Sequence, residues 1–318
     1  MKPPTRRRTP SVSVSIPASA DLHVHTTHSD GSCTPGDVVR SAASVGLTAL
    51  AITDHDTLTA LAVARPEAVR LGLELVGGIE LTAVREAREI HLLGHFVRDD
   101  DPKLVAVTAA LRVARSTRIV AMSERLQALG LWVDLLAIRR TFPRATLGRK
   151  HLADWLCLTG QVENAREAFA KYLGDDGPAS VAKMRVPWRE AIALIRGAGG
   201  VAGLAHPPYD LRQSTLDELC EGGLGSIEVA GPGINPKLGL RWREWAEAKG
   251  LVPIAGSDFH APDRPGRWVG AIVTPGEDLE RLRAARPSTR LVADDEGAEH
   301  PSWPTETDPS PKGCLART

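Results

Sequence analysis

The stretch "LTALAITDHD", residues 47–56, decides the fold, because an apolar run is followed at once by three ionisable side chains. A short apolar run bounded by polar residues predicts a buried strand. The segment before it, residues 34–46, begins with Thr34 as an N-cap and ends at Gly46, which predicts a helix. A helix, a buried strand and a polar cluster therefore follow one another.

The same succession recurs along the chain. Further apolar runs lie at 73–79, 201–205 and 251–256, and 89–96 is a further predicted strand of alternating character. The three apolar runs lead to ionisable groups, which are Glu80, His206 and Asp258. Apolar strands that alternate with helices predict parallel βα units, and in barrels of such units the functional groups lie at the carboxyl ends of the strands. We therefore expect an α/β barrel with these side chains at one rim.

Residues 101–185 break the succession. The stretch 103–130 carries apolar residues at helical spacing, and the segments 148–160 and 162–174 predict two more helices. We expect a helical insertion over the mouth of a barrel formed by residues 18–100 and 186–285. The polar, proline-rich tails, 1–17 and 294–318, are predicted to be disordered.

Composition restricts the class of protein. The chain has 318 residues, which suits one sizeable domain with an insertion, or two small domains. Lys and Arg together number 39, as do Asp and Glu, so the zero net charge argues against binding long duplex nucleic acid. The four cysteines form no CxxC pair, which favours a reducing, cytoplasmic compartment. Neither a signal peptide nor a membrane span is expected.

Two pairs of ligand-type side chains have i, i+2 spacing. His23 and His25 lie two apart on a predicted strand, so both face the same side. Asp258 and His260 repeat this spacing after another strand. Metal sites often use this arrangement, although two exposed polar residues in a loop would look the same.

His55 and Glu80 each lie at the predicted end of a buried strand. Asp54 and Asp56 flank His55 and are expected to orient its ring by hydrogen bonds. A buried, unpaired carboxylate at Glu80 would cost free energy, which indicates a partner there.

Simpler structural roles are open for several of these residues. Asp30 lies in a Ser-Asp-Gly turn that its side chain could cap, and His91 and His206 could be hydrogen-bonded core histidines. His28 is expected to lie in a loop near the site, and His95 to be structural. Imidazoles and carboxylates at several strand ends together favour a multinuclear site for divalent Mn, Fe or Zn. The nine candidate ligands are His23, His25, Asp30, His55, Glu80, His91, His206, Asp258 and His260.

Six motifs in order resemble those of the PHP (polymerase and histidinol phosphatase) family. They are "DLHVHTTHSDG", "ITDHDT", "GIE", "IHLLGH", "LAHP" and "GSDFHAP", and they span about residues 20–275. The pattern is most similar to the branch of bacterial nucleoside 3',5'-bisphosphate phosphatases and 5'→3' exoribonuclease-like phosphoesterases. Counterparts of the insertion segments "RVARSTRIVAM", "GRKHLA" and "KYLGDDGPASV" occur in that branch.

What the resemblance implies is a distorted (β/α)7 barrel with a centre of three divalent metal ions. The implied ligands of the first ion are His23, His25, Glu80 and Asp258. Glu80 would also bridge to a second ion, whose other implied ligands are His91 and His206. The implied ligands of the third ion are Asp30, His55 and His260. The departures from the family pattern are His28 and a missing aromatic residue after "GSIEVAGP" (225–232), and both bear on how the substrate fits.

The activity that the resemblance implies is metal-dependent hydrolysis of a phosphate ester. The expected substrates are nucleoside 3',5'-bisphosphates or the 5' ends of short single-stranded RNA, attacked in line by a hydroxide that the metals activate. Such a centre supplies the nucleophile, so no serine or cysteine nucleophile is needed. The sequence carries no GxSxG elbow.

Cationic residues of the insertion are candidates for binding a second phosphate. Arg115 and Arg118 are neighbours at i, i+3 on one helix. Arg149, Lys150 and His151 open the next helix, where backbone N–H groups also favour anions. Each could equally be a solvated surface charge.

Three other functions compete with this one. A histidinol-phosphate phosphatase, or another small-molecule phosphomonoesterase, would share the barrel and the metals. A non-catalytic PHP module typically loses metal ligands, whereas all nine positions are filled here. A deacetylase or amidohydrolase would be expected to show a carboxylated lysine or fewer ligands.

Overall fold

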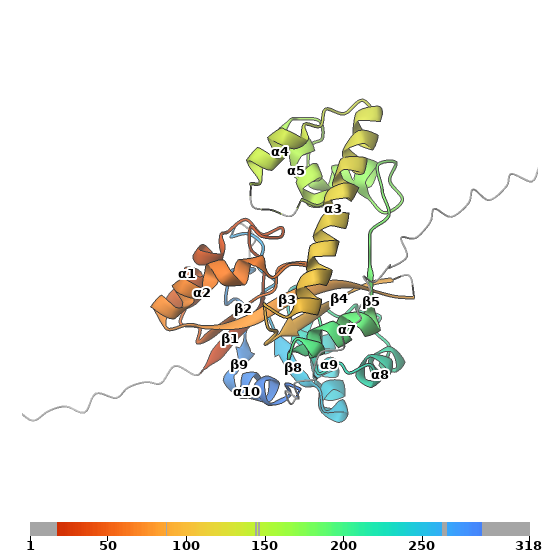
Figure 1. Cartoon of the computed structure of the whole chain (residues 1–318). Coiled ribbons are helices and arrows are strands. Elements are labelled where there is room, and N and C mark those ends of the chain that lie inside the picture. Colours follow the sequence, from red (N-terminus) through yellow and green to blue (C-terminus); the bar gives the residue numbers. More distant parts are fainter. Residues whose placement is uncertain (1–17, 87, 144, 146, 263–265, 288–318) are drawn as a thin grey trace, which may run out of the picture.

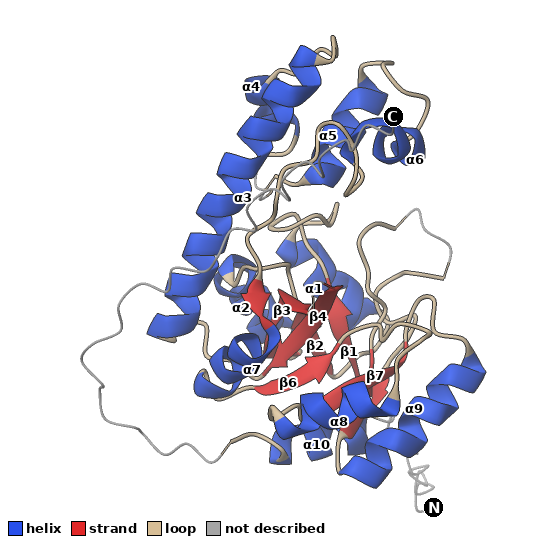
Figure 2. Ribbon diagram, turned by 90° about the vertical axis from the view of Figure 1, so that its right-hand side faces the viewer, coloured by secondary structure: helices blue, strands red, loops and turns tan. Residues whose placement is uncertain are grey.

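The computed structural model describes residues 18–287 apart from 87, 144, 146 and 263–265. The predicted tails, 1–17 and 294–318, therefore lie outside the described residues. Within the described part, a mixed and nearly closed barrel-like sheet is covered by helices, and a second group of helices lies above it (Figures 1 and 2). The α/β barrel that the sequence predicts is confirmed.

Seven strands of four or more residues form the body of the sheet in the described part of the chain. Their order is β8-β7-β6-β4-β3-β2-β1. Their bounds are β1 Ser19–Val24, β2 Ala49–Ile52, β3 Glu74–Arg85, β4 Arg88–His95, β6 Val201–Leu204, β7 Ser226–Ala230 and β8 Val252–Ala255. Two short strands, β5 (Val186–Pro187) and β9 (Thr274–Pro275), pair with β3 and β1. The His25 N–H donates to the Phe259 carbonyl at 2.9 Å, which links the ends of β1 and β8.

Strand β4 departs from the expected parallel pattern. It is antiparallel to both β3 and β6, whereas β1, β2 and β3 are parallel, as are β6, β7 and β8. Only residues 86 and 87 separate β3 from β4, too few for a crossover, so the two strands form a hairpin. β3 also continues to Arg85, and the prediction that Glu80 ends its strand is wrong.

Helices cover the outer face of the barrel (Figure 1). They are α1 Pro35–Ser44, α2 Thr59–Leu71, α7 Trp188–Gly197, α8 Gln213–Glu221 and α9 Pro236–Lys249. The predicted cap of α1 is confirmed, because Thr34 accepts from the Asp37 N–H and the Asp37 carboxylate accepts from the Thr34 N–H. Another helix, α10 (Gly276–Ala284), lies beside the start of β1, where Leu279 and Leu282 join the barrel's inner apolar cluster.

The segment between β4 and β5 is helical. It contains α3 Pro102–Ala128, α4 Leu135–Thr141, α5 Arg149–Leu158, α6 Ala165–Ala168 and a π-helical turn η1 Phe169–Leu173. The helices expected over 103–130, 148–160 and 162–174 are confirmed. α3 extends from the barrel to α4 and α5 (Figure 1), and Met122, Leu126 and Leu156 belong to a separate hydrophobic cluster there. Across the described residues, no helix has both the length and the apolar character required to cross a bilayer.

Candidate metal centre

The barrel brings the nine predicted ligands into one cluster. Seven lie at or beyond the ends of β1, β2, β6 and β8, and these are His23, His25, Asp30, His55, His206, Asp258 and His260. The other two, Glu80 and His91, project from within β3 and β4. Thr82 lies opposite His91 in the hairpin register, so Glu80 and His91 share one face. Segments far apart in the sequence therefore meet at this rim.

The first group of ligand-type atoms comes from His23, His25 and Asp258. The Nε2 atoms of the two histidines are 3.1 Å apart. Asp258 Oδ1 lies 3.5 Å from His23 Nε2 and 3.4 Å from His25 Nε2. Glu80 Oε2 faces the same nitrogens at 3.5 and 3.2 Å respectively. Two imidazole nitrogens and two carboxylate oxygens thus converge on one small volume.

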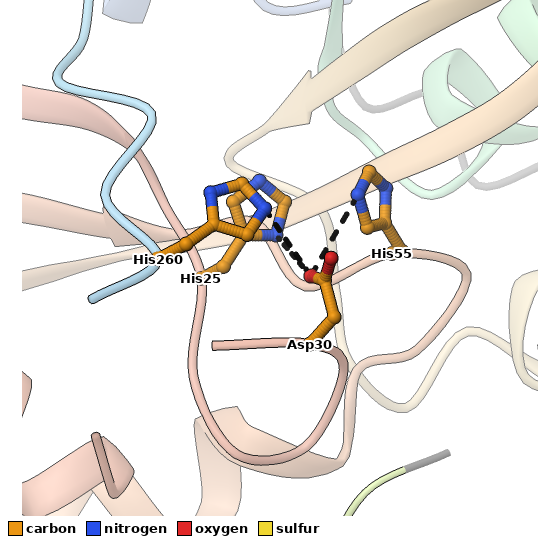
Figure 3. A group of neighbouring side chains, drawn as sticks. All are labelled: His25, Asp30, His55 and His260. Atoms are coloured by element: carbon orange, nitrogen blue, oxygen red, sulfur yellow. Dashed lines mark ion pairs between the residues drawn. The ribbon is translucent and has the colours of Figure 1, made fainter. Parts of the chain in front are cut away.

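Asp30 lies at the centre of a second group, which Figure 3 shows with His25, His55 and His260. Its Oδ1 is 3.2 Å from His260 Nε2, 3.9 Å from His55 Nε2 and 4.0 Å from His25 Nδ1. The His260 ring also stacks on the His25 ring, with centroids 4.2 Å apart. Three imidazoles around one carboxylate oxygen are ligands that divalent transition metals accept.

Glu80 presents its two oxygens to different histidines. Oε1 is 2.8 Å from His91 Nδ1 and 3.1 Å from His206 Nε2. Oε2 is 2.8 Å from His55 Nδ1. The side chain is fully buried. Each oxygen of Glu80 therefore has its own set of neighbouring ring nitrogens.

The buried carboxylates depend on positive charge beside them. Burial by itself would raise the pKa of Glu80, but the neighbouring histidine rings, His55 foremost, hold that pKa well below its usual range. Burial would lower the pKa of His25, yet the Asp258 and Glu80 carboxylates beside its ring raise that pKa to about 10. Protons on the rings or bound cations can provide this charge.

The donor set fits divalent cations. His55 Nδ1 and Glu80 Oε2 are buried and lie 2.8 Å apart, but neither atom has a well-aligned hydrogen bond within the described part of the chain. A buried polar atom without such a partner costs free energy. A metal ion satisfies imidazole lone pairs and carboxylate oxygens at the same time, and Mn, Fe and Zn all accept this mixture.

Among the described residues, the carboxylates that flank His55 form their hydrogen bonds and ion pairs with other partners than its ring. Asp54 accepts from the Thr26 backbone N–H at 2.7 Å and so fixes the loop after β1. Asp56 instead pairs with Arg115 at 2.6 Å. The predicted role of these two residues is wrong, because successive side chains after a strand point in different directions.

A pocket of about 140 Å³ lies beside Asp30 and His55. All five cationic candidates from the helical segment line it, and these are Arg115, Arg118, Arg149, Lys150 and His151. Lys150 Nζ donates to the Asp30 carbonyl at 3.1 Å, which links the pocket to a loop that carries a candidate ligand. The structure therefore places these five residues together next to the cluster of candidate metal ligands.

The arginines of this pocket are unevenly neutralised. Arg115 pairs with Asp56 at 2.6 Å, and Arg149 pairs with Asp175 at 2.5 Å. Arg118 donates to a backbone carbonyl, and no carboxylate of the described residues lies within ion-pair distance of it. Burial, with Arg149 and Arg115 nearby, lowers the pKa of Arg118 to about 10. The pocket thus holds positive charge that an anion would neutralise.

His151 has a clear structural role. Its Nδ1 accepts from the Gly148 N–H at 3.0 Å and so caps α5. The ring is buried and packs edge-on against Phe142, with centroids 4.9 Å apart. Burial, together with the nearby Lys150 charge, lowers the pKa of His151 to about 4, so the ring is neutral near pH 7.

Two further charged residues at this end of the barrel were not predicted from the sequence. Lys183 lines the pocket and lies 3.2 Å from Glu89, but it belongs to an irregular segment before β5 that carries no motif. Glu228 is buried in β7 and contacts His23 at 3.0 Å. A lone carboxylate inside the apolar run "SIEVA" was the available signal for Glu228.

Comparison with known proteins gives consistent relatives. Residues 21–177 match the PHP domain. A 3',5'-nucleoside bisphosphate phosphatase from Chromobacterium violaceum is 34% identical over 260 residues, which cover 80% of this chain and 91% of the relative. The 5'-3' exoribonuclease Rnm of Escherichia coli is 34% identical over 249 residues, which cover 76% of this chain and 85% of the relative. A phosphoribosyl 1,2-cyclic phosphate 1,2-diphosphodiesterase from Eggerthella lenta is 35% identical over 248 residues, which cover 76% of this chain and 93% of the relative.

One solved structure shares both the fold and 30% of the aligned sequence with this chain. It is a provisionally assigned metal-dependent phosphoesterase from Bifidobacterium adolescentis, with a TM-score of 0.77 and 30% identity. The match covers 85% of this chain and 97% of that one. The barrel, the clustered ligand-type side chains and the relatives point to the same assignment. The chain belongs to the PHP domain family and is a metal-dependent phosphoesterase.

Proposed function

We propose that this enzyme hydrolyses phosphate from nucleoside 3',5'-bisphosphates or from the 5' ends of short RNA. The observation that carries the proposal is the cationic pocket beside Asp30 and His55, with the unneutralised charge of Arg118 inside it. A substrate with two phosphates can present one to the metal-ligand cluster and the other to this pocket. The names of two relatives, a bisphosphate phosphatase and an exoribonuclease, support such a substrate.

The proposal assigns the nine clustered residues to three divalent ions. One ion would be held by His23, His25, Glu80 and Asp258, the second by Glu80, His91 and His206, and the third by Asp30, His55 and His260. Divalent ions in such a site would supply Lewis-acid charge for the phosphoryl oxygens and would lower the pKa of water, so that hydroxide is available to attack near neutral pH.

The remaining groups bind and orient the substrate. Arg118, Arg149 and Lys150 would hold the phosphate that does not react, because these cations line the pocket. Asp56 pairs with the Arg115 guanidinium at 2.6 Å and so fixes one cation of the pocket lining. Holding the second phosphate places the scissile ester against the metal-ligand cluster.

The charge of the pocket disfavours the principal alternative. Histidinol phosphate carries one phosphate and a cationic amine, so it offers nothing for Arg118 to bind, and its amine would be repelled there. A non-catalytic module is a further alternative, and it would show no turnover with any phosphate ester.

A substrate panel tests the proposal. With Mn²⁺ added, kcat/KM would be measured for adenosine 3',5'-bisphosphate, 5'-phosphorylated short RNA, phosphoribosyl 1,2-cyclic phosphate, histidinol phosphate and an aryl phosphate. We expect one of the first two to exceed the last two by at least about tenfold, since one phosphate contact contributes about 1.5–3 kcal/mol. A kcat/KM for histidinol phosphate equal to or greater than that for the bisphosphate and the RNA would refute the proposal. If the cyclic diester gave the highest kcat/KM, a cyclic phosphodiesterase activity would replace the proposed one.

A pair of variants links the preference to the pocket. Arg149→Ala should raise KM for the bisphosphate more than for the aryl phosphate, because only the bisphosphate reaches the pocket. Arg139→Ala, an exposed arginine of α4, is the control and should change neither. Equal effects of Arg149→Ala on both substrates would remove the second-phosphate argument.

A further inference from the structure

Glu228 links two of the candidate ligands from a strand that carries none of them. It lies in β7, between β6 and β8, and is 2% exposed. Its Oε1 is 3.0 Å from the Nδ1 atom of His23. Its Oε2 accepts from the backbone N–H of His206 at 2.5 Å.

We propose that Glu228 is a positioning residue that fixes the His23 ring and the His206 backbone together for metal binding. This inference rests on the proposed function in one respect, that His23 and His206 are metal ligands. It adds an acceptor that serves both residues at once, one that neither the motifs nor the ligand groups contain.

The contact with His23 selects the tautomer that metal binding needs. A carboxylate accepts hydrogen bonds but does not donate them, so the ring proton of His23 must lie on Nδ1. Nε2 then keeps its lone pair, and that atom lies 3.5 Å from both Glu80 Oε2 and Asp258 Oδ1. A carboxylate behind the ring also makes the imidazole a more basic ligand.

The contact with His206 stabilises a backbone conformation of this residue that non-glycine residues rarely adopt. The φ angle of His206 is +25°, in the left-handed half of the map. The Glu228 carboxylate binds the N–H of this same residue. With the backbone held there, His206 Nε2 lies 3.1 Å from Glu80 Oε1.

An amide cannot replace the carboxylate in both contacts. Glutamine has nearly the same shape but presents one oxygen acceptor and one NH₂ donor. If its oxygen accepts from the His206 N–H, its NH₂ group faces His23 Nδ1 and favours the tautomer with the proton on Nε2. If its oxygen accepts from His23, the His206 N–H meets a donor. Glu228→Gln therefore disturbs one ligand with little change in packing.

The first experiment measures Mn²⁺ binding by calorimetry to chelator-treated wild type, Glu228→Gln and Asp278→Asn. Asp278 is the control because it is an equally buried carboxylate, paired with Arg281 at 2.8 Å and outside the ligand groups. We expect the apparent Kd for Mn²⁺ to rise 10- to 100-fold in Glu228→Gln, with the control within twofold of wild type. A Glu228→Gln protein that folds and binds Mn²⁺ within twofold of wild type would overturn the inference.

A second measurement does not depend on a variant that folds. In zinc-loaded wild type, long-range ¹H–¹⁵N spectra of the histidine rings should show the His23 proton on Nδ1. A proton on Nε2 of His23, or none on Nδ1, would overturn the inference. The proposed function is judged separately by phosphate release, so a wild type that binds Mn²⁺ but fails on the substrate panel would sink that function and leave Glu228 as a positioning residue.

Discussion

Replacing Arg118 by Gln should stabilise the free protein while it weakens the hold on a doubly phosphorylated substrate. Gln can still donate to the Val181 carbonyl, which Arg118 Nε reaches at 2.7 Å, but it carries no charge. Burial, with Arg149 and Arg115 nearby, lowers the pKa of Arg118 from 12.5 to about 10. The fold therefore disfavours the charge that the proposed substrate would use.

The magnitude follows from that shift. A drop from 12.5 to about 10 corresponds to about 3 kcal/mol at about 1.4 kcal/mol per pKa unit. Arg118 is partly exposed, so solvent screening reduces this cost to about 1 kcal/mol. The guanidinium is charged in both folded and unfolded chains below pH 10, so the cost is present throughout the neutral range. One lost contact to a phosphate should in turn lower kcat/KM by about 10- to 100-fold.

Urea unfolding and steady-state kinetics measure the two effects. Arg118→Gln should have a free energy of unfolding about 1 kcal/mol above wild type, and its kcat/KM should fall for the bisphosphate but not for an aryl phosphate. Arg139→Gln on exposed α4 serves as the control. A less stable Arg118→Gln protein, or an equal loss with both substrates, would refute the reasoning.

Three further predictions concern the barrel and its ligands. Asp258→Ala removes a carboxylate within 3.5 Å of two candidate ligands, and phosphate release with Mn²⁺ should fall by more than the 10- to 100-fold typical of outer-sphere partners; undiminished release would contradict the metal-site assignment. Gly256→Ala would set a Cβ 2.4 Å from the His23 Cβ, so chemical denaturation should show a loss of about 1–3 kcal/mol, and unchanged stability would argue against this contact. Burial lowers the pKa of His95 to about 4 from 6.5, and its Nε2 lies 2.8 Å from the Leu22 carbonyl. Because the unfolded chain binds this proton first, stability is full above pH 6.5 and falls by up to about 3 kcal/mol down to pH 4. His95→Gln, which can still donate to that carbonyl, should flatten the pH dependence of unfolding over that range, and an unchanged profile would contradict the assignment.

Local patterns were sufficient for most of the secondary structure and for the kinds of side chain at the site. The apolar run at 47–53 and the cap at Thr34 depend on neighbours in the sequence, and both elements formed as expected. The i, i+2 spacing placed His23 and His25 on one side of the chain, where their Nε2 atoms are 3.1 Å apart. Such features are local because burial and capping act within a few residues.

Contacts between distant segments were decided by the closure of the barrel. The hairpin between β3 and β4 put Glu80 inside a strand, between histidines from four other segments. Asp56 forms an ion pair with Arg115 rather than a hydrogen bond with His55. Glu228 contacts His23, although 205 positions separate the two residues in the sequence. By itself the sequence determined most of the strands and the kinds of ligand side chain that this protein has. Only the tertiary structure decided which side chains share a partner, because strand pairing, not spacing along the chain, sets those distances.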